Sequence, residues 1–154
     1  MRILAAALFL AVAGSASAQA PNLAPSRATL CDPKSNRYDA VTAAPYSHTV
    51  LFEDDHVRVL EILLPPLASE PIHIHALPSV MMGDTGGGAG AKYLYTEYKF
   101  EGGKFVEVEK REVTPTPGFR TVYSGPEGPH AITNLGAVPM RITRTEIKPE
   151  ACAK

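Results

Sequence analysis

The sequence has little of what several common protein classes require. Its 154 residues include two cysteines and no tryptophan, and two cysteines are too few for a small domain built on disulfides. The 15 basic and 16 acidic residues give a formal net charge of -1 without any Lys/Arg cluster, so a nucleic-acid-binding surface is not expected. The hydrophobic fraction of 45% excludes a disordered chain and permits one compact domain with a real core.

A helical pattern is also missing. Beyond residue 18, no twelve-residue stretch has apolar residues at i, i+3, i+4 and i+7 without a Pro or Gly. Instead, beyond residue 46 the pattern has period two, and pairs such as Pro65-Pro66 and Gly102-Gly103 separate the runs. The predicted strands are 47–52, 56–64, 72–75, 79–82, 92–100, 104–112, 119–123, 131–134 and 140–148. Many short strands with regular turns predict an all-β sandwich or barrel.

The first 18 residues have the order of a secretory signal peptide. Arg2 precedes an apolar run over residues 3–13, and the small triplet Ala16-Ser17-Ala18 follows. At about 1.5 Å per residue this run covers roughly half of a ~30 Å hydrocarbon core, which disfavours a membrane span. We therefore expect cleavage after Ala18 and a periplasmic or secreted mature protein that does not contact a membrane.

The mature chain divides into three parts. Residues 19–46 are rich in Ala, Pro, Ser and Asn and are expected to form an extended lead-in. Residues 47–148 form the folded domain, and residues 149–154 form a short C-terminal tail.

The two cysteines lie near the two ends of the mature chain. Export makes a disulfide between Cys31 and Cys152 chemically feasible. Such a bond would contribute about 4–5 kcal/mol in the chain-entropy model, because the loop that it closes is long. Two free thiols are the alternative, since the sequence does not report the Cα separation.

Two of the five histidines form the segment His73-Ile74-His75. On a strand, residues two apart project to the same face, so these two imidazoles lie close enough to share one metal ion. Ile72 and Ile74 then pack on the opposite face. The histidine face is therefore either the solvent side or the cavity side of the sheet.

A third histidine follows a turn much later in the chain. Pro126 and Gly128 shape the turn, which delivers His130 to the start of a strand. Asn134 follows four residues later, and its amide is placed to pin a neighbouring loop.

Together these two segments resemble the two motifs of the cupin superfamily, whose members are small double-stranded β-helix, or jelly-roll, barrels. The first family motif is G-x5-H-x-H-x(3,4)-E-x6-G, which His73 and His75 match. The second is G-x5-P-x-G-x2-H-x3-N, and its matches are Pro126, Gly128, His130 and Asn134. The resemblance covers roughly residues 47–148 and is greatest to small exported single-domain cupins of bacteria. It implies a double-stranded β-helix barrel and a homodimer.

The sequence departs from the family pattern at the metal-binding glutamate. That position holds Ser79 or Val80, depending on the spacing, the leading glycine of the first motif is absent, and Gly128 lies one residue too close to His130. Glu70 is the nearest carboxylate in the sequence. It precedes His73 by three residues, so on a regular strand it is expected to face away.

The resemblance implies a mononuclear metal site of His73, His75 and His130 that holds Fe, Mn, Ni or Zn. Three neutral imidazoles leave the ion its full +2 charge, which favours a small anionic or chelating organic substrate. Oxygenase, lyase and isomerase chemistry are all compatible with such a centre, and no further catalytic residue is assigned. The alternative is a non-catalytic periplasmic module that binds or senses a small ligand without metal.

No metal-binding role is expected for the other two histidines, for the tyrosines or for the glycine-rich segment. His48 and His56 have no partner at metal-ligand spacing and are expected at the surface or at a strand edge. Tyr93 and Tyr95 are predicted to point together, with Tyr98 opposite; one face of this aromatic strand would line the cavity, and core packing is expected for at least one face. The glycine-rich segment 83–90 opens no helix and has no following Lys-Ser/Thr, so it is predicted to be a hairpin loop at the barrel rim and not a phosphate loop.

Overall fold

The computed structural model describes residues 23, 25–84, 90–116 and 118–153, so the expected signal peptide lies outside the described residues. In chain order the elements are α1 (Arg27–Cys31), η1 (Pro33–Ser35), α2 (Ala40–Ala43), β1 (His48–Glu53), β2 (Val57–Leu64), β3 (His73–His75), β4 (Ser79–Asp84), β5 (Tyr93–Glu101), β6 (Lys104–Val113), β7 (Phe119–Ser124), β8 (Glu127–Asn134), β9 (Met140–Ile147) and η2 (Glu150–Cys152). Each strand coincides with one predicted run, and most ends shift by one or two residues. The period-two pattern therefore located the strands correctly.

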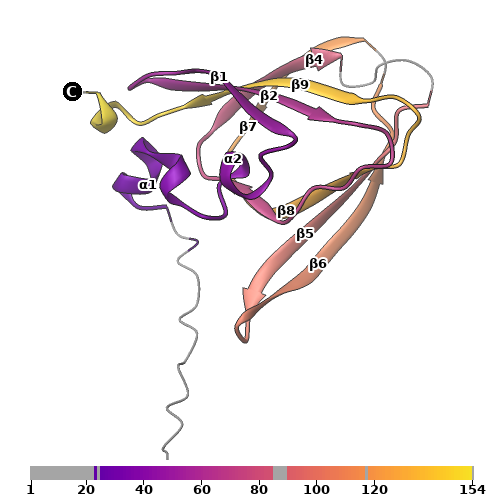
Figure 1. The fold of residues 1–154 in the computed structure, drawn as a ribbon, viewed down its shortest axis with the longest axis horizontal. Helices are drawn as coiled ribbons and strands as arrows, with labels where there is room; N and C mark the ends of the chain where they lie inside the picture. The colour runs from indigo at the N-terminus through magenta and orange to yellow at the C-terminus, as the bar shows by residue number, and fades with distance from the viewer. Residues whose placement is uncertain (1–22, 24, 85–89, 117, 154) are drawn as a thin grey trace, which may run out of the picture.

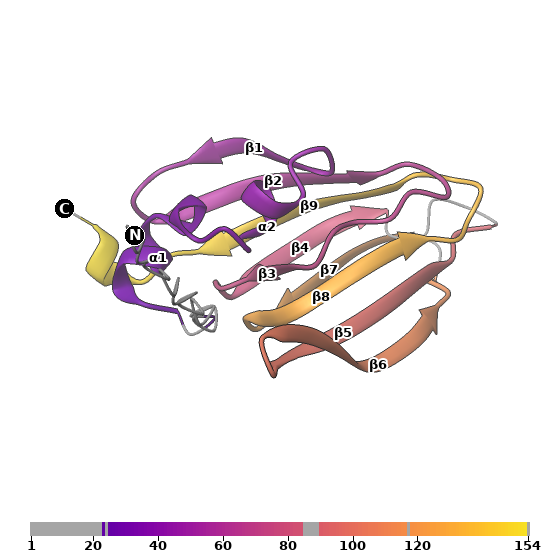
Figure 2. The same ribbon diagram turned by 60° about the horizontal axis from the view of Figure 1, so that its bottom comes forward.

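The strands form two antiparallel sheets (Figures 1 and 2). One sheet has the order β1-β2-β9-β4-β7 and the other has the order β3-β8-β5-β6. Strands far apart in sequence are neighbours, as β2 and β9 or β3 and β8 are, because the chain passes repeatedly between the sheets. This is the antiparallel jelly-roll arrangement, so the predicted all-β double-stranded β-helix is confirmed.

The hydrophobic core lies between the two sheets. Ile62 and Leu64 of β2 and Met140 of β9 pack from one sheet, and Tyr93 of β5 packs from the other. Along β2 the side chains alternate between half-buried and buried positions. The core uses every second residue, which is the pattern from which the strand was predicted.

Strand β8 begins earlier than predicted, at Glu127 and not at residue 131. Its pairing with β3 joins His73 to His130 and His75 to Glu127, so three steps along β8 oppose two steps along β3. The extra residue is a β-bulge, and bulges are among the few places where a sheet accepts proline. Gly128 and Pro129 therefore lie within the strand, although the sequence indicated a turn there.

The lead-in is not an extended chain as far as the structure describes it. It forms three short helical turns, α1, η1 and α2, and the side chain of Asp39 caps α2 by accepting a hydrogen bond from the amide of Val41. The segment then docks on β3, where the amide of Ile74 donates to the carbonyl of Tyr38 at 2.8 Å. Short caps and long-range docking fix its shape, and neither produces a periodic sequence pattern.

Cys31 and Cys152 form a disulfide across a sequence separation of 121 residues. The bond joins the end of α1 to η2, and the guanidinium of Arg27 donates to the carbonyl of Ala151 at 2.6 Å beside it. The lead-in and the C-terminal tail are thereby tied to each other.

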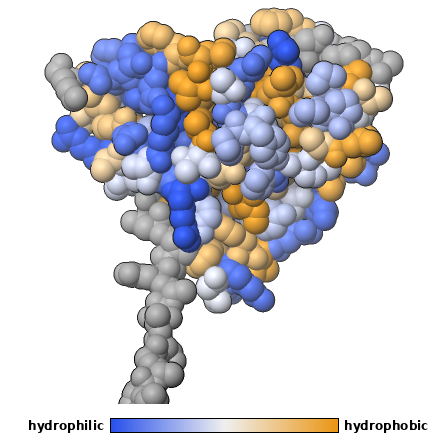
Figure 3. All heavy atoms as spheres, viewed as in Figure 1, coloured by the Kyte–Doolittle hydropathy of each residue, from blue (hydrophilic) through white to orange (hydrophobic). Residues whose placement is uncertain are grey.

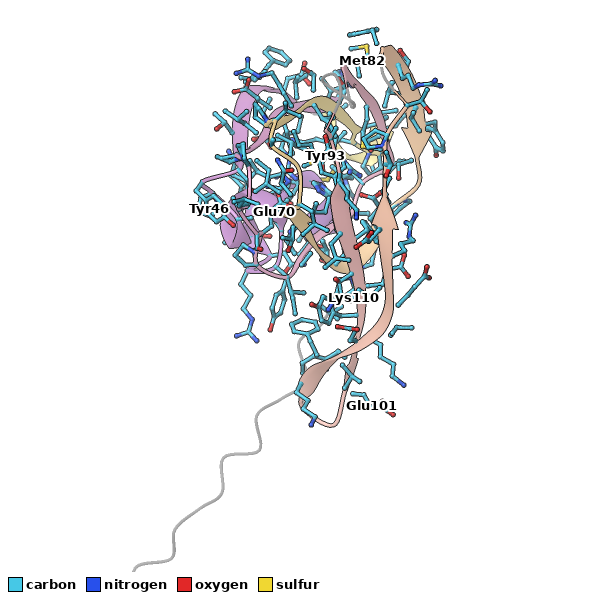
Figure 4. The ribbon with its side chains drawn as sticks, turned by 90° about the vertical axis from the view of Figure 1, so that its right-hand side faces the viewer. Tyr46, Glu70, Met82, Tyr93, Glu101 and Lys110 are labelled. Atoms are coloured by element: carbon cyan, nitrogen blue, oxygen red, sulfur yellow. A yellow bond between two sulfur atoms is a disulfide. The ribbon has the colours of Figure 1, made fainter. Side chains whose placement is uncertain are left out.

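The β5–β6 hairpin extends from the body of the molecule, with Glu101 near its tip (Figure 4). The glycine-rich segment is not a hairpin, because β4 pairs with β7 and β9 whereas β5 pairs with β6 and β8. It connects two sheets, and its residues 85–89 lie outside the described part of the chain. On the face in Figure 3, hydrophobic residues form separate patches among hydrophilic ones. Within the described residues, no helix is long and apolar enough to cross a membrane.

Candidate metal centre

Four imidazoles gather in the space between the sheets. His73 and His75 come from β3, His130 comes from β8 and His48 comes from the start of β1, and each is at most 2% exposed. The ring centroids of neighbouring imidazoles lie between 4.4 Å, for His73 and His130, and 5.7 Å, for His75 and His130. The structure thus brings together the three histidines of the two motifs, and it adds a fourth.

The prediction for His48 was wrong. His48 does lie on an edge strand, but its side chain points inward and makes ring contacts with His73 and His75. Its backbone amide donates to the carbonyl of Ala44, so the end of α2 sets where the strand begins. No sequence motif connects His48 to β3, because the contact depends on how the lead-in docks. His56, by contrast, is exposed as expected.

Hydrogen bonds fix the imidazoles of β3 and β8 in one orientation. The Nδ1 atoms of His73 and His130 lie 2.9 Å and 2.8 Å from the carbonyl oxygens of Pro71 and Gly128. A carbonyl oxygen only accepts, so each Nδ1 carries the hydrogen and each Nε2 keeps a free lone pair. Histidines that bind metals are commonly oriented in this way.

His75 is oriented by a buried charge network. Its Nδ1 lies 2.8 Å from Oε1 of Glu146, whose other oxygen accepts a 2.6 Å hydrogen bond from Nε of Arg58. The remaining guanidinium nitrogens of Arg58 donate to both carboxylate oxygens of Asp39 at 2.8 and 2.6 Å. The charges of Asp39 and Glu146 hold the pKa of Arg58 above its ordinary value, although its burial acts in the opposite direction.

All four imidazoles are held in the neutral form. Burial is the largest cause: it lowers the pKa of His48 to about 4, and the pKa values of His73 and His75 fall well below 6.5. The pKa of His130 is lowered as well, again chiefly by burial. Neutral imidazole is the form that coordinates a metal ion, so no proton has to be removed first.

The donor atoms form two overlapping sets with the spacing of metal ligands. One set is His48, His73 and His75, and the other is His75, Glu127 and His130. Within each set all donor atoms lie within 4.8 Å of one another. The two sets share His75, and neither contains both His73 and His130, so the three ligands predicted from the motifs are divided between the two sets.

Glu127 and Glu146 are already paired with cations. Oε2 of Glu127 accepts a 2.6 Å hydrogen bond from Nη1 of Arg144, and Oε1 accepts from the hydroxyl of Ser124 at 2.9 Å. Burial raises the pKa of Glu127, but the charge of Arg144 outweighs burial and holds this pKa below its ordinary value. Sequence reasoning missed Glu127, because the turn prediction for residues 125–129 gave its side chain no direction.

Glu70 was predicted to face away, and this prediction was wrong. Its carboxylate is buried, with Oε1 3.7 Å from Nδ1 of His48 and Oε2 3.9 Å from Nε2 of His73. Neither oxygen has a hydrogen-bond partner, and burial raises the pKa of Glu70 to about 7. The parity argument failed because β3 begins only at His73, so residues 70–72 do not follow the strand alternation.

Two further predictions concern residues around the cluster. Asn134 does pin the β8–β9 turn: its Nδ2 donates to the carbonyls of Leu64 and Val138 at 3.1 and 2.8 Å, and its Oδ1 accepts from the amide of Gly136 at 2.9 Å. Ser79, at the position of the family glutamate, is fully buried on β4 and supplies no carboxylate.

A cavity of about 430 Å³ opens from the imidazoles towards the hydrophobic core. Its walls are mostly apolar, and Tyr93 and Tyr95 both line it, so the face that these two tyrosines share is the cavity face. Arg144 of β9 forms part of the wall; it is 2% exposed, and its Nη2 has no hydrogen-bond partner. The cavity therefore combines apolar walls, neutral imidazoles and one buried cation.

A divalent metal ion fits this donor set. The charged groups around the imidazoles comprise the buried carboxylates of Asp39, Glu70 and Glu146, the half-buried carboxylate of Glu127, and the buried guanidiniums of Arg58 and Arg144. Four anions and two cations leave two negative charges when all are ionised, and a buried unpaired charge is costly. A divalent ion would neutralise both of these charges, and Glu70 would gain the partner that it lacks.

No protein-family model matches the chain, and no curated protein matches it. Among solved structures, a cupin domain from Bordetella pertussis Tohama I has a TM-score of 0.47 and 20% identity over 66% of this chain and 92% of its own. An RmlC-like cupin with a double-stranded β-helix fold from Methanocaldococcus jannaschii has a TM-score of 0.43 and 13% identity, covering 66% and 78%. A cupin superfamily protein from Desulfitobacterium hafniense has a TM-score of 0.41 and 11% identity, covering 66% and 76%.

The chain's own topology and the position of its two motifs define the fold. Two antiparallel sheets enclose a cavity, the H-x-H pair lies on β3, and the late histidine lies directly opposite on β8. The chain has the fold of a cupin.

Proposed function

We propose that this protein is an exported cupin with a mononuclear divalent metal centre, in which His73, His75 and His130 are ligands. The single observation that carries the proposal is the buried cluster of neutral imidazoles, whose orienting hydrogen bonds leave Nε2 of His73 and of His130 free. Fe, Mn, Ni and Zn all accept such nitrogen donors. When bound, the ion would supply Lewis acidity or a site for redox chemistry.

The cavity supports a small anionic or chelating organic substrate. Its apolar walls suit a hydrophobic body, and Arg144 places an unsatisfied Nη2 in the wall near the imidazoles. A substrate oxyanion that contacts both the centre and Arg144 would satisfy this nitrogen. Such binding is compatible with oxygenase, lyase and isomerase chemistry.

Export is part of the proposal. The signal-peptide pattern of residues 1–18 supports it, and so does the disulfide, because disulfides persist mainly in oxidising compartments. A homodimer remains a prediction from the cupin resemblance, and the mass of the mature protein in solution would test it.

Metal analysis of protein purified without added metal tests the proposal. We expect near-stoichiometric Fe, Mn, Ni or Zn in the wild type and a loss of most of it in His73→Ala, because one oriented ligand is removed. His56→Ala is the matched control, since His56 is exposed and lies outside the cluster. Metal at background level in the wild type, even after incubation with each of these ions, would leave the metal-free ligand-binding module as the better description. With metal present, oxygen uptake with diketones, thiols or phenolic acids separates an oxygenase from redox-neutral chemistry.

A further inference from the structure

We propose that His48 and Glu70, which lie outside both histidine motifs, are also ligands of the metal, and that Glu70 replaces the carboxylate missing from β4. The inference rests on the proposed metal centre and changes its composition. The ligand set would then draw on β1 and on the segment before β3, as well as on the two motif strands.

The spacing of His48 supports the first part. Its donor atom lies within 4.8 Å of the donor atoms of both His73 and His75. Two nitrogens on opposite sides of one ion are about 4.2 Å apart, because each metal–nitrogen bond is about 2.1 Å long. Three atoms 4.8 Å apart lie about 2.8 Å from their common centre, so movements of at most about 0.7 Å each would bring the three nitrogens to bonding distance.

The carboxylate of Glu70 faces the same point. Its two oxygens lie 3.7 Å from His48 and 3.9 Å from His73, which is too long for hydrogen bonds. These distances are instead typical of two atoms bound to one ion, which lie between about 3.0 Å for neighbouring ligands and about 4.2 Å for opposite ligands. Figure 4 shows Glu70 within the body of the molecule, far from the exposed hairpin carboxylate Glu101.

Glu70 is also the one of these carboxylates without an arginine partner. Glu127 is bonded to Arg144, and Glu146 is bonded to Arg58. Both oxygens of Glu70 are buried without a hydrogen-bond partner, and its side chain is 1% exposed. Burying a carboxylate in this state costs several kcal/mol, and a bound cation removes that cost.

The backbone holds both residues in place without the metal. The amide of Glu70 donates to the carbonyl of Ile132 on β8 at 2.8 Å, and the adjacent Ser69 forms a β-bridge with Thr133. The backbone amide of His48 donates a hydrogen bond to the carbonyl of Ala44, and His48 pairs with Ile62 of β2. A carboxylate ligand would lower the charge of the occupied centre from +2 to +1.

Titration with Co²⁺ tests the assignment. We expect Glu70→Gln and His48→Gln each to weaken Co²⁺ binding by more than about 100-fold, beyond the roughly 10–100-fold effect of a residue that only supports a ligand. The Co²⁺ absorption bands should also change in both variants. His56→Gln is the matched control, because His56 is exposed and lies outside the cluster. Glu127→Gln is measured beside them as the competing assignment, because Glu127 belongs to the other donor set.

The outcomes separate the two proposals. If the wild type binds no Co²⁺, the proposed function fails. This inference fails and the proposed function stands in two cases. In the first, the wild type, Glu70→Gln and His48→Gln bind Co²⁺ alike, while His73→Ala does not bind it. In the second, Glu127→Gln weakens Co²⁺ binding and Glu70→Gln does not.

A second measurement uses the wild type alone, in case a variant does not fold. In proton NMR of the Co²⁺ form, each bound imidazole gives one strongly shifted exchangeable N–H signal. Four such signals are expected, and three or fewer would contradict the four-histidine ligand set.

Discussion

Arg58 holds the orientation of His75 from behind the cluster. The guanidinium is fully buried, with two bonds to Asp39 and one to Glu146, and Glu146 in turn contacts Nδ1 of His75. The five N–H donors of a guanidinium permit this arrangement, and a lysine could not reproduce it.

Replacement of Arg58 by Met is expected to lower the free energy of unfolding by about 3–5 kcal/mol. The substitution preserves most of the volume but leaves two buried carboxylates without their cation. Urea denaturation of the metal-free protein measures the change.

Arg141→Met is the control for this prediction. Arg141 lies on β9, which pairs with the strand of Arg58, and its 3.3 Å ion pair with Glu61 is largely exposed, so we expect a loss of at most about 1 kcal/mol. Equal losses in the two variants would contradict the role assigned to the buried network.

At the scale of elements, a short strand and a β-bulge place the donor atoms. β3 has three residues, all buried, and its histidines face the cavity because Ile74 packs and pairs against the lead-in. The bulge in β8 moves His130 opposite His73 while Glu127 faces His75. A regular β8 without the extra residue would break one of these two pairings.

The ends of β1 and β9 are joined to the lead-in by ion pairs at Glu53. Its two oxygens bind Lys34 at 2.9 Å and Lys148 at 3.0 Å. Partial burial by itself would raise the pKa of Glu53, but the hydrogen bonds from the two lysines outweigh it and hold the pKa below its ordinary value. A carboxyl group whose pKa is lower in the folded state stabilises the fold above its unfolded pKa, and this contribution disappears as the pH falls through the folded pKa.

Glu53→Gln is therefore expected to be less stable than the wild type at pH 7, with a difference that narrows as the pH falls from about 5 to below 4. Thermal unfolding across this range measures the difference. Glu101→Gln, in the exposed Lys99 pair at the hairpin tip, should show almost no difference at any pH. A gap between Glu53→Gln and the wild type that stays constant down to pH 3 would show that the ion pairs are not its cause.

At the scale of the whole molecule, the disulfide connects the two ends of the described chain. It closes a 121-residue loop that contains every strand of both sheets. The chain-entropy model therefore assigns it a large effect on the unfolded state, about 4–5 kcal/mol.

The double variant Cys31→Ser/Cys152→Ser is expected to lose about this much stability in urea, with its strands retained by circular dichroism. A reductant should destabilise the wild type to the same level and leave the double variant unchanged. Detection of two free thiols in the unreduced, unfolded wild type would contradict the bond itself.

The sequence alone determined the strands and the pair on β3. Period-two alternation is a local property, so nine strand positions followed from it, and an H-x-H spacing on a strand fixes which face its imidazoles share. The late motif predicted His130 and the role of Asn134, because its Pro-x-Gly pattern is a local signal for an irregular backbone segment before His130.

Only the tertiary structure decided that His48 and Glu70 enter the cluster. Their directions depend on where the lead-in docks, on the irregular path before β3, and on contacts between residues 70 and 132 and between residues 48 and 62. Such contacts form when the two sheets pack together over the core, and they produce no periodic pattern in the sequence. Alternation could assign a face only to residues inside a strand, so it failed for Glu70 and gave no inward role to a histidine on an edge strand.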